Sequence, residues 1–369
     1  MSTSADVVVL GAGAAGCATA YFLAREGVRV RVIERESIGS CASGYAQGML
    51  NPLTGNGIPG PNEPLAIAGF NMHRELWPVL QEEAQVDIQA RMVPQLDLCF
   101  RVDEIDGLRE EMERWDRADG FSARWLGPDE VHRLEPRIAE DVKGAVLLEN
   151  VGMLDSYRYT LALAQAAERH GAEFVTGEVV GLRSSGGRAT GVAMGRGDIP
   201  CQAVVIALGP WSGRASDWLG LDIPVEPLKG QMIYLEGLDP PLEQYVHGPG
   251  TLAQKVDGNV WIGATEEHAG FDTGTTVEAR DSLVRMALEM VPSLGRLGFL
   301  RQTACLRPVT PDSRPIIGRL PGWDGVFLAT GAEKKGILFS PAMGRAVADL
   351  ILTGNTSLSL EAYSPERFS

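Results

Sequence analysis

The chain enters its first regular element with the apolar run Val7-Val8-Val9-Leu10, which leads at once into Gly11-Ala12-Gly13-Ala14-Ala15-Gly16. The apolar run is typical of a buried strand, and the residues after the glycines favour a helix. A strand, a glycine turn and a helix in this order open a Rossmann-like unit. The stretch therefore predicts an α/β fold that begins with a dinucleotide site.

Each glycine of this turn has its own task in such a site. Gly11 lets the chain leave the strand sharply, Gly13 lets a pyrophosphate approach bare backbone, and Gly16 brings the helix close to the sheet. Ala14 and Ala15 stand at the predicted helix start. Unpaired N–H groups and the positive end of the helix dipole would face the phosphates there.

An acidic residue completes the motif. A second strand is predicted over Val28–Ile33, and Glu34 follows Gly16 by 18 residues. A carboxylate at this point accepts ribose hydroxyl groups and repels a ribose phosphate. Glu34 thus disfavours NADP, whereas NAD and FAD both stay open.

The composition narrows the class of protein. A chain of 369 residues is long enough for about two domains. A formal net charge of -15 argues against nucleic acid or an anionic membrane surface as partner. The early first strand leaves no room for a cleavable signal and no apolar run could span a bilayer, which predicts a cytoplasmic protein without integral membrane association. Five cysteines without CxxC spacing indicate reduced thiols and no metal site.

Helices and strands alternate along most of the remaining chain. Amphipathic helices are predicted over Leu65–Val79, Ile105–Ala118 and Ser156–His170, and strands over Glu173–Val175 and Ala203–Ala207. A return from helix to strand is typical of α/β folds. The chain is expected to end with one more helix, which begins near Pro341.

Two segments depart from this alternation. Small residues dominate the segment from Gly39 to Met49, which we expect to be irregular and to lie close against a ligand. From Pro224 to Thr265 the pattern changes to short strands, clearest at Gln231–Leu235 and Asn259–Gly263. These strands predict an antiparallel sheet that covers the ligand.

Together the motifs resemble the D-amino-acid oxidase superfamily of flavoenzymes, most closely its glycine oxidase and sarcosine oxidase branches, over essentially the whole chain. The further markers are Ala42-Ser43-Gly44 to Gly48-Met49, Ala207-Leu208-Gly209-Pro210-Trp211, Leu306-Arg307-Pro308 with Asp312, and Gly336 to Ala342. The resemblance implies FAD rather than NAD. It also implies a Rossmann-like FAD-binding domain of the glutathione-reductase type, with an inserted α+β substrate domain built on a mainly antiparallel sheet.

By this resemblance both domains are discontinuous. Residues 1–78, 144–214 and 305–369 are expected to form the FAD-binding domain, and residues 79–143 and 215–304 the substrate-binding domain. The residues expected to bind FAD are Gly11, Gly13, Ala14, Ala15, Gly16, Glu34, Arg35, Ser43, Gln47, Gly48, Met49, Val179, Ala207, Gly209, Trp211, Gly336, Ile337 and Leu338.

The resemblance places two cationic side chains in the catalytic site. Arg307 takes the position of an arginine that clamps the substrate carboxylate, and a planar guanidinium suits such bidentate pairing. Lys334 stands where the glycine oxidase branch has a second arginine, and Ala332 where it often has a histidine. A lysine attracts an anion as a point charge rather than as a fork.

Three further positions bear on the flavin linkage, the electron acceptor and the substrate. Cys305 stands where the sarcosine oxidase branch forms a thioether to flavin, so a covalent flavin and a small buried thiol both stay open. Trp261 stands where sarcosine oxidases carry a lysine that activates oxygen, and Thr251 near a tyrosine that covers the substrate in glycine oxidases. The electron acceptor, oxygen or another, and the exact substrate stay open, as does a homo-oligomer.

The implied reaction is hydride transfer to flavin from the alpha carbon of glycine, an N-alkyl glycine or a D-amino acid. The resulting imine is hydrolysed to an oxo acid. This reaction requires no general base, and we expect His73, His132 and His170 at the surface. Tyr234 and Tyr245 are candidates to cover the substrate. Two alternatives are a glycine-like amine on modified tRNA, which the acidic charge disfavours, and a flavoprotein without turnover.

Overall fold

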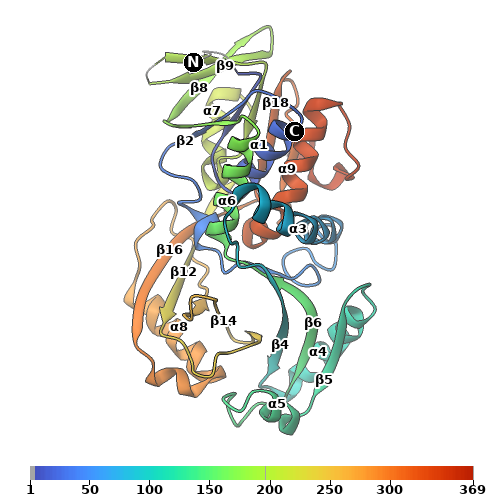
Figure 1. Cartoon of the computed structure of the whole chain (residues 1–369), viewed down its shortest axis with the longest axis vertical. Helices are drawn as coiled ribbons and strands as arrows, with labels where there is room; N and C mark the ends of the chain where they lie inside the picture. Colours follow the sequence, from blue (N-terminus) through green and yellow to red (C-terminus); the bar gives the residue numbers. More distant parts are fainter. Residues whose placement is uncertain (1–4, 196, 369) are drawn as a thin grey trace.

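The structure is a computed structural model that describes residues 5–195 and 197–368. Two large sheets and a small one organise this part of the chain, with most helices around the first sheet (Figure 1). Its α-helices are α1 (Ala14–Arg25), α2 (Ala42–Tyr45), α3 (Glu63–Ala84), α4 (Ile105–Asp116), α5 (Pro128–Leu134), α6 (Ser156–Arg169), α7 (Ser216–Leu219), α8 (Val277–Met290) and α9 (Gly336–Leu352).

The strands are also numbered in the order in which they occur along the chain. They are β1 (Val7–Leu10), β2 (Val30–Glu34), β3 (Met49–Leu50), β4 (Arg91–Cys99), β5 (Ser122–Leu126), β6 (Gly144–Met153), β7 (Glu173–Thr176), β8 (Val179–Ser185), β9 (Arg188–Met194), β10 (Gly197–Pro200), β11 (Ala203–Ile206), β12 (Glu226–Leu235), β13 (Tyr245–His247), β14 (Thr251–Gln254), β15 (Val260–Gly263), β16 (Phe299–Val309), β17 (Ile316–Arg319) and β18 (Val326–Thr330).

The first sheet has the order β17-β18-β11-β1-β2-β7 and is parallel except for β17. Strand β1 is apolar throughout because both of its faces are buried. Val7 and Val9 pack in the core with helices α1, α3, α6 and α9. Val8 and Leu10 pack toward the small β10-β9-β8 sheet on the other face. The strand therefore lies inside a three-layered Rossmann-like unit.

The second sheet has the order β16-β12-β15-β14-β13-β4-β6-β3, and β5 pairs with β6 at its side. It is antiparallel except where β13 runs parallel to β4. Its core packs against α8, and its long strands fill the lower half of Figure 1. The sheet confirms the predicted α/β fold with a mainly antiparallel second sheet.

Strand membership bears on the division into domains. Strand β6 belongs to the second sheet, although its residues 144–153 fall within the segment expected to bind FAD. Strand β16 crosses from one side of the boundary expected at residue 305 to the other. The division itself stays a prediction, and these strands are where its boundaries are least sharp.

Helix α9 begins five residues before the expected start at Pro341. A proline inside a helix lacks the N–H that would bond to the carbonyl four residues earlier, here that of Ile337. His73 Nε2 lies 2.8 Å from this carbonyl oxygen, and Ser340 Oγ donates to it at 2.8 Å as well. These two groups replace the missing donor, so the helix extends through Pro341 from Gly336.

The expectation that His73 lies at the surface is therefore wrong. Its side chain is fully buried between α3 and α9, with its ring 4.8 Å from that of Tyr159. Its Nδ1 atom has no hydrogen-bond partner in the described part of the chain, which leaves Nε2 to carry the hydrogen toward the Ile337 carbonyl. Burial lowers the pKa of His73 to about 4. The two other histidines that were expected at the surface are His132, which is half-buried, and His170, which is exposed.

A smaller difference concerns the segment from Gly39 to Met49. It holds a single helical turn, α2, which ends where Ala46 N donates to Ala42 O. The segment is otherwise irregular, as expected. It lies against the glycine turn after β1, because Ala14 N donates to Ser43 Oγ at 2.9 Å.

Candidate active site

A cavity of about 670 Å³ lies at the carboxyl ends of the parallel strands, the usual place for a ligand in such sheets. Its far wall comes from β12, β14 and β16 of the second sheet. All of the predicted site residues line it except Gly16. That glycine lies behind the first turn, where an added Cβ atom would come within 2.0 Å of Gly11 O.

The glycine turn has the shape that a dinucleotide needs. Gly11 has a φ of +101°, and an added Cβ atom would meet Ala207 O at 2.4 Å. Beyond it, the N-terminus of α1 opens into the cavity at Gly13 and Ala14. The Ala14 N–H donates to Ser43 Oγ at 2.9 Å, and the other backbone N–H groups at this helix start are the ones that suit a pyrophosphate.

Glu34 is held at the end of β2 by two backbone groups. Ala12 N donates to its Oε2 at 2.8 Å and Glu36 N donates to its Oε1 at 3.0 Å. A carboxylate accepts further hydrogen bonds, so both oxygens remain able to take ribose hydroxyl groups. Nearby, the Arg35 guanidinium lies 5.1 Å from the centre of the Trp211 ring. These residues fit the nucleotide half of FAD.

Gln47 is fixed by three contacts at the other end of the cavity. Its Nε2 donates to Trp261 O at 3.0 Å, while its Oε1 accepts from Tyr245 and Thr251 at 3.1 and 2.9 Å. The next two residues, Gly48 and Met49, also line the cavity. Gln47 is therefore a rigid part of the wall that we expect to face the flavin ring.

Helix α9 points its N-terminus at the same space. Gly336, Ile337 and Leu338 line the cavity, and the first N–H groups of a helix have no partner inside the helix. Together with the helix dipole they favour negative charge at this point. The arrangement fits the pyrimidine edge of a flavin, which becomes anionic on reduction.

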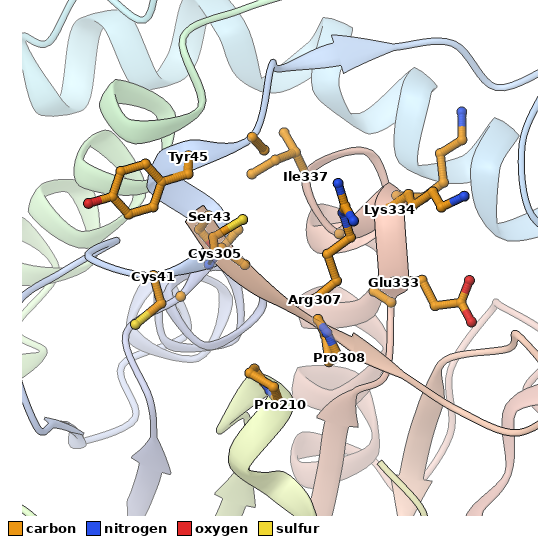
Figure 2. A pocket seen from close by; sticks show the side chains of 18 of the residues that line it. Cys41, Ser43, Tyr45, Pro210, Cys305, Arg307, Pro308, Glu333, Lys334 and Ile337 are labelled. Carbon is orange, nitrogen blue, oxygen red and sulfur yellow. Dashed lines mark hydrogen bonds between the residues drawn. The ribbon is translucent and has the colours of Figure 1, made fainter. Parts of the chain in front are cut away.

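Arg307 lies on β16 and points into the cavity. Its guanidinium lies over Gly230, where an added Cβ atom would come within 2.3 Å of Nη2. Its Nη1 donates to Thr265 O at 3.0 Å, and within residues 5–195 and 197–368 no carboxylate lies at ion-pair distance. Figure 2 shows Arg307 beside Ile337 at the start of α9. The guanidinium therefore keeps donors for an acidic ligand.

Lys334 lies in the turn just before α9, near Arg307 (Figure 2). Its ammonium forms an ion pair with Glu266, which also lines the cavity, and its side chain is 37% exposed. An exposed, paired lysine binds an anion less strongly than an unpaired one. We therefore expect Lys334 to bind the substrate less strongly than Arg307 does.

Cys305 lies two residues before Arg307, and alternate residues of a strand share a face. Both side chains consequently line the cavity. Burial raises the pKa of the Cys305 thiol, which keeps it protonated at neutral pH. The geometry leaves both a thioether and a free thiol open.

Trp261 and Tyr234 do not line the cavity. Both are buried, with their rings 4.8 Å apart in an edge-on contact. Tyr245 and Thr251 do belong to the cavity wall. Of the two tyrosines expected to cover the substrate, only Tyr245 is thus in a position to do so.

Four further residues line the cavity but belong to no recognisable sequence motif. Asn51, Gln95, His247 and Lys335 come from four separate segments and meet only in the folded chain. Of these four residues, only Lys335 has a signal in the sequence, because it is adjacent to Lys334, which was predicted. Behind the wall, Lys255 donates to Gln47 O and Leu154 O at 2.7 Å each, and burial lowers its pKa to about 8.

The described part of the chain offers neither a metal site nor a membrane-spanning helix. No group of three or more His, Cys, Asp or Glu side chains there is arranged to hold a metal ion. The helices in this part are all too short or too polar to cross a membrane.

The comparisons with known proteins agree with this geometry. The family described as FAD dependent oxidoreductase matches residues 6–350. A glycine oxidase from Pseudomonas aeruginosa is 32% identical over 98% of this chain and 99% of its own. The structure of glycine oxidase from Geobacillus kaustophilus has a TM-score of 0.93 at 30% identity, covering 98% of each chain. That of iminodiacetate oxidase from Chelativorans sp. has a TM-score of 0.89 at 26% identity, covering 97% of this chain and 98% of that one.

The fold and the site together define a flavoenzyme of the Rossmann-like class. The chain belongs to the family of FAD-dependent oxidoreductases that includes the glycine oxidases, and its cofactor is FAD. The family resemblance seen in the motifs is thereby confirmed.

Proposed function

We propose that the protein oxidises the alpha-carbon amine of a small amino acid, with Arg307 as the group that binds the substrate carboxylate. One observation carries the proposal: Arg307, which has no carboxylate partner within residues 5–195 and 197–368, points into the cavity that we expect to hold the flavin. A guanidinium left without an acidic partner favours binding of an acidic ligand.

The reaction follows from where the chain's own groups lie. FAD supplies the hydride acceptor when bound. Arg307 holds the carboxylate, which fixes the alpha carbon relative to the flavin. The Thr265 carbonyl fixes the guanidinium through Nη1, and Nη2 and Nε stay available for a two-point contact. The substrate amine must be neutral to release hydride, and the imine that forms is hydrolysed to an oxo acid.

The relatives support this reaction type rather than one substrate. Their names refer to glycine and to iminodiacetate, and both compounds carry an amine one carbon from a carboxylate. We extend the proposal to N-alkyl glycines and D-amino acids, with oxygen or another compound as electron acceptor. The residues expected at FAD, the domain boundaries and a cytoplasmic location are part of the same proposal.

The two alternatives have less support. A modified tRNA would need basic surface, whereas the chain carries a net charge of -15. A flavoprotein without turnover would have no use for an unpaired arginine in its cavity. We therefore retain amino acid oxidation as the function.

The test is an anaerobic mixing experiment with the FAD-bound protein. Glycine, sarcosine, D-alanine and D-proline are added separately, and flavin absorbance is followed. We expect at least one of them to bleach the flavin, and R307M to bleach far more slowly with the same compound. Persistence of the colour with all amino acids tested would contradict the proposal. Oxygen added afterwards separates an oxidase from a dehydrogenase.

A further inference from the structure

One part of the cavity has no role in the reaction described so far. Its wall consists of Asn51, Thr54, Gly55, Asn56, His247 and Lys335, and we refer to it as the lysine arm. Lys335 reaches into it from the turn before α9, and its Nζ donates to Asn51 O at 3.0 Å. The lysine arm opens into the same cavity as Arg307.

Lys335 has no acidic partner in the described part of the chain, where each lysine ion pair involves Lys229 or Lys334. The nearby carboxylates are already engaged. Glu333 accepts from Asn56, and Asp97 forms an ion pair with His247 at 2.6 Å and accepts from Gln95 at 2.6 Å. Desolvation and the charge of Lys334 lower the pKa of Lys335 to about 8, which leaves it mainly protonated at neutral pH. A half-buried cation without an acidic partner favours an anionic ligand.

The backbone of the lysine arm is shaped around this side chain. Gly55 has a φ of +118°, and an added Cβ atom would lie 2.2 Å from Lys335 Cε. Any larger residue at position 55 would displace the lysine. The loop therefore accommodates Lys335 in one place rather than leaving it free in solvent.

A short chain of contacts relates the lysine arm to Arg307. Arg307 donates to Thr265 O, and the next residue, Glu266, pairs with Lys334. Lys334 is followed directly by Lys335. Arg307 and Lys335 are thus both cavity cations that have no carboxylate partner among the described residues, and the Glu266–Lys334 pair links them along the chain; Arg214, the third such cation, instead lies 4.7 Å from the centre of the Phe271 ring.

We propose that the natural substrate is an amino acid with a second carboxylate, which Lys335 binds in the lysine arm while Arg307 binds the first. The inference rests on the function proposed above and specifies its substrate class. A purely apolar side chain is disfavoured in the lysine arm, because it would bury the ammonium with the Asn51 carbonyl as its partner and no negative charge beside it. The second carboxylate is attached either to the substrate nitrogen or to its side chain.

The first experiment compares matched substrates that differ in one acidic group. Iminodiacetate is paired with N-ethylglycine, D-aspartate with D-asparagine, and D-glutamate with D-glutamine. Anaerobic flavin reduction gives the dissociation constant and limiting rate for each. In the wild type we expect the acidic member of at least one pair to bind about tenfold to a hundredfold more tightly. The pair that shows this preference identifies where the second carboxylate is attached.

Variants of Lys335 then show whether this residue causes the preference. K335M and K335Q should lose it, with less than about threefold change for the neutral members, since a charge-assisted contact is removed from one class only. K335R should retain part of it. K143M changes an exposed lysine outside the cavity and serves as the matched control. Equal losses for both members of a pair, or no preference in the wild type, would overturn the inference.

A binding measurement separates this inference from the proposed function. Calorimetric titration of the FAD-bound protein with succinate and with butyrate needs no turnover. Tighter binding of succinate in the wild type, lost in K335M, supports the second carboxylate site even if no amino acid bleaches the flavin. Similar binding of the two acids in wild type and K335M would contradict the site whatever the activity.

Discussion

His73 allows a quantitative test of how the buried start of α9 is stabilised. Its folded-state pKa of about 4 lies below its ordinary value of 6.5 because the ring is buried and its Nδ1 has no acceptor. As the pH falls below 6.5 the unfolded chain binds a proton that the folded chain does not bind until about pH 4. Stability is therefore present above pH 6.5 and lost as the pH falls toward 4.

The magnitude follows from these two values. Between pH 7.5 and pH 5 the linkage contributes a loss of about 2 kcal/mol, approaching about 3 kcal/mol near pH 4. Replacement of His73 by Leu removes this dependence. In this variant the Ile337 carbonyl keeps Ser340 Oγ as its donor but loses His73, and Pro341 has no N–H to replace it. We expect a cost of about 1 to 3 kcal/mol at pH 7.5 from this change.

The assay is urea unfolding of the FAD-bound protein at pH 7.5 and pH 5, with the same free FAD in every sample. H73L should lose about 2 kcal/mol less than the wild type between the two pH values. The variant P341A restores a backbone donor, so H73L should cost about 1 kcal/mol less in that background. H268Q changes an exposed histidine and should behave as the wild type. Equal pH dependence in H73L and wild type would refute this account of His73.

Three further predictions concern the site. Arg307→Ala should raise the KM for monocarboxylate amino acids by about a hundredfold to a thousandfold with FAD still bound, because the guanidinium is proposed to bind the substrate carboxylate and is not part of the nucleotide cradle; an unchanged KM in steady-state assays would remove Arg307 from the site. Gly16→Ala should lose FAD, measured as visible absorbance per protein, because a Cβ atom there would lie 2.0 Å from Gly11 O; full flavin content would show that the turn adapts. Acid precipitation should leave the flavin in the supernatant, since desolvation raises the pKa of the half-buried Cys305 thiol, and a protonated thiol is a poor nucleophile; colour in the pellet, lost in C305S, would demonstrate a thioether.

Local features of the fold were predictable from the sequence. The glycine turn, Glu34 and the helix predicted over Ser156–His170 depend on neighbouring residues, and the structure places each as expected. The start of α9 was not predictable in this way. Whether a helix continues through Pro341 depends on His73, which is 264 residues away from Ile337 in the chain.

The same distinction between local and long-range features holds for the residues of the site. The residues expected to bind FAD fall in short motifs, and all but Gly16 line one cavity. The lysine arm has no such motif, because Asn51, His247 and Lys335 are brought together by strand order in the second sheet and by the turn before α9. Nor does periodicity reveal that Lys334 forms an ion pair whereas Lys335 forms none with the other described residues.

The account depends most on one arrangement: a flavin in the cavity within reach of an arginine that binds acids. Titration of the FAD-bound protein with acetate, which cannot be oxidised at an amine, tests it directly through the visible flavin spectrum. We predict a saturable spectral shift in the wild type and in K143M, and none over the same range in R307M, which should retain its flavin. An identical shift in R307M, or a protein without flavin absorbance after reconstitution with FAD, would contradict the account.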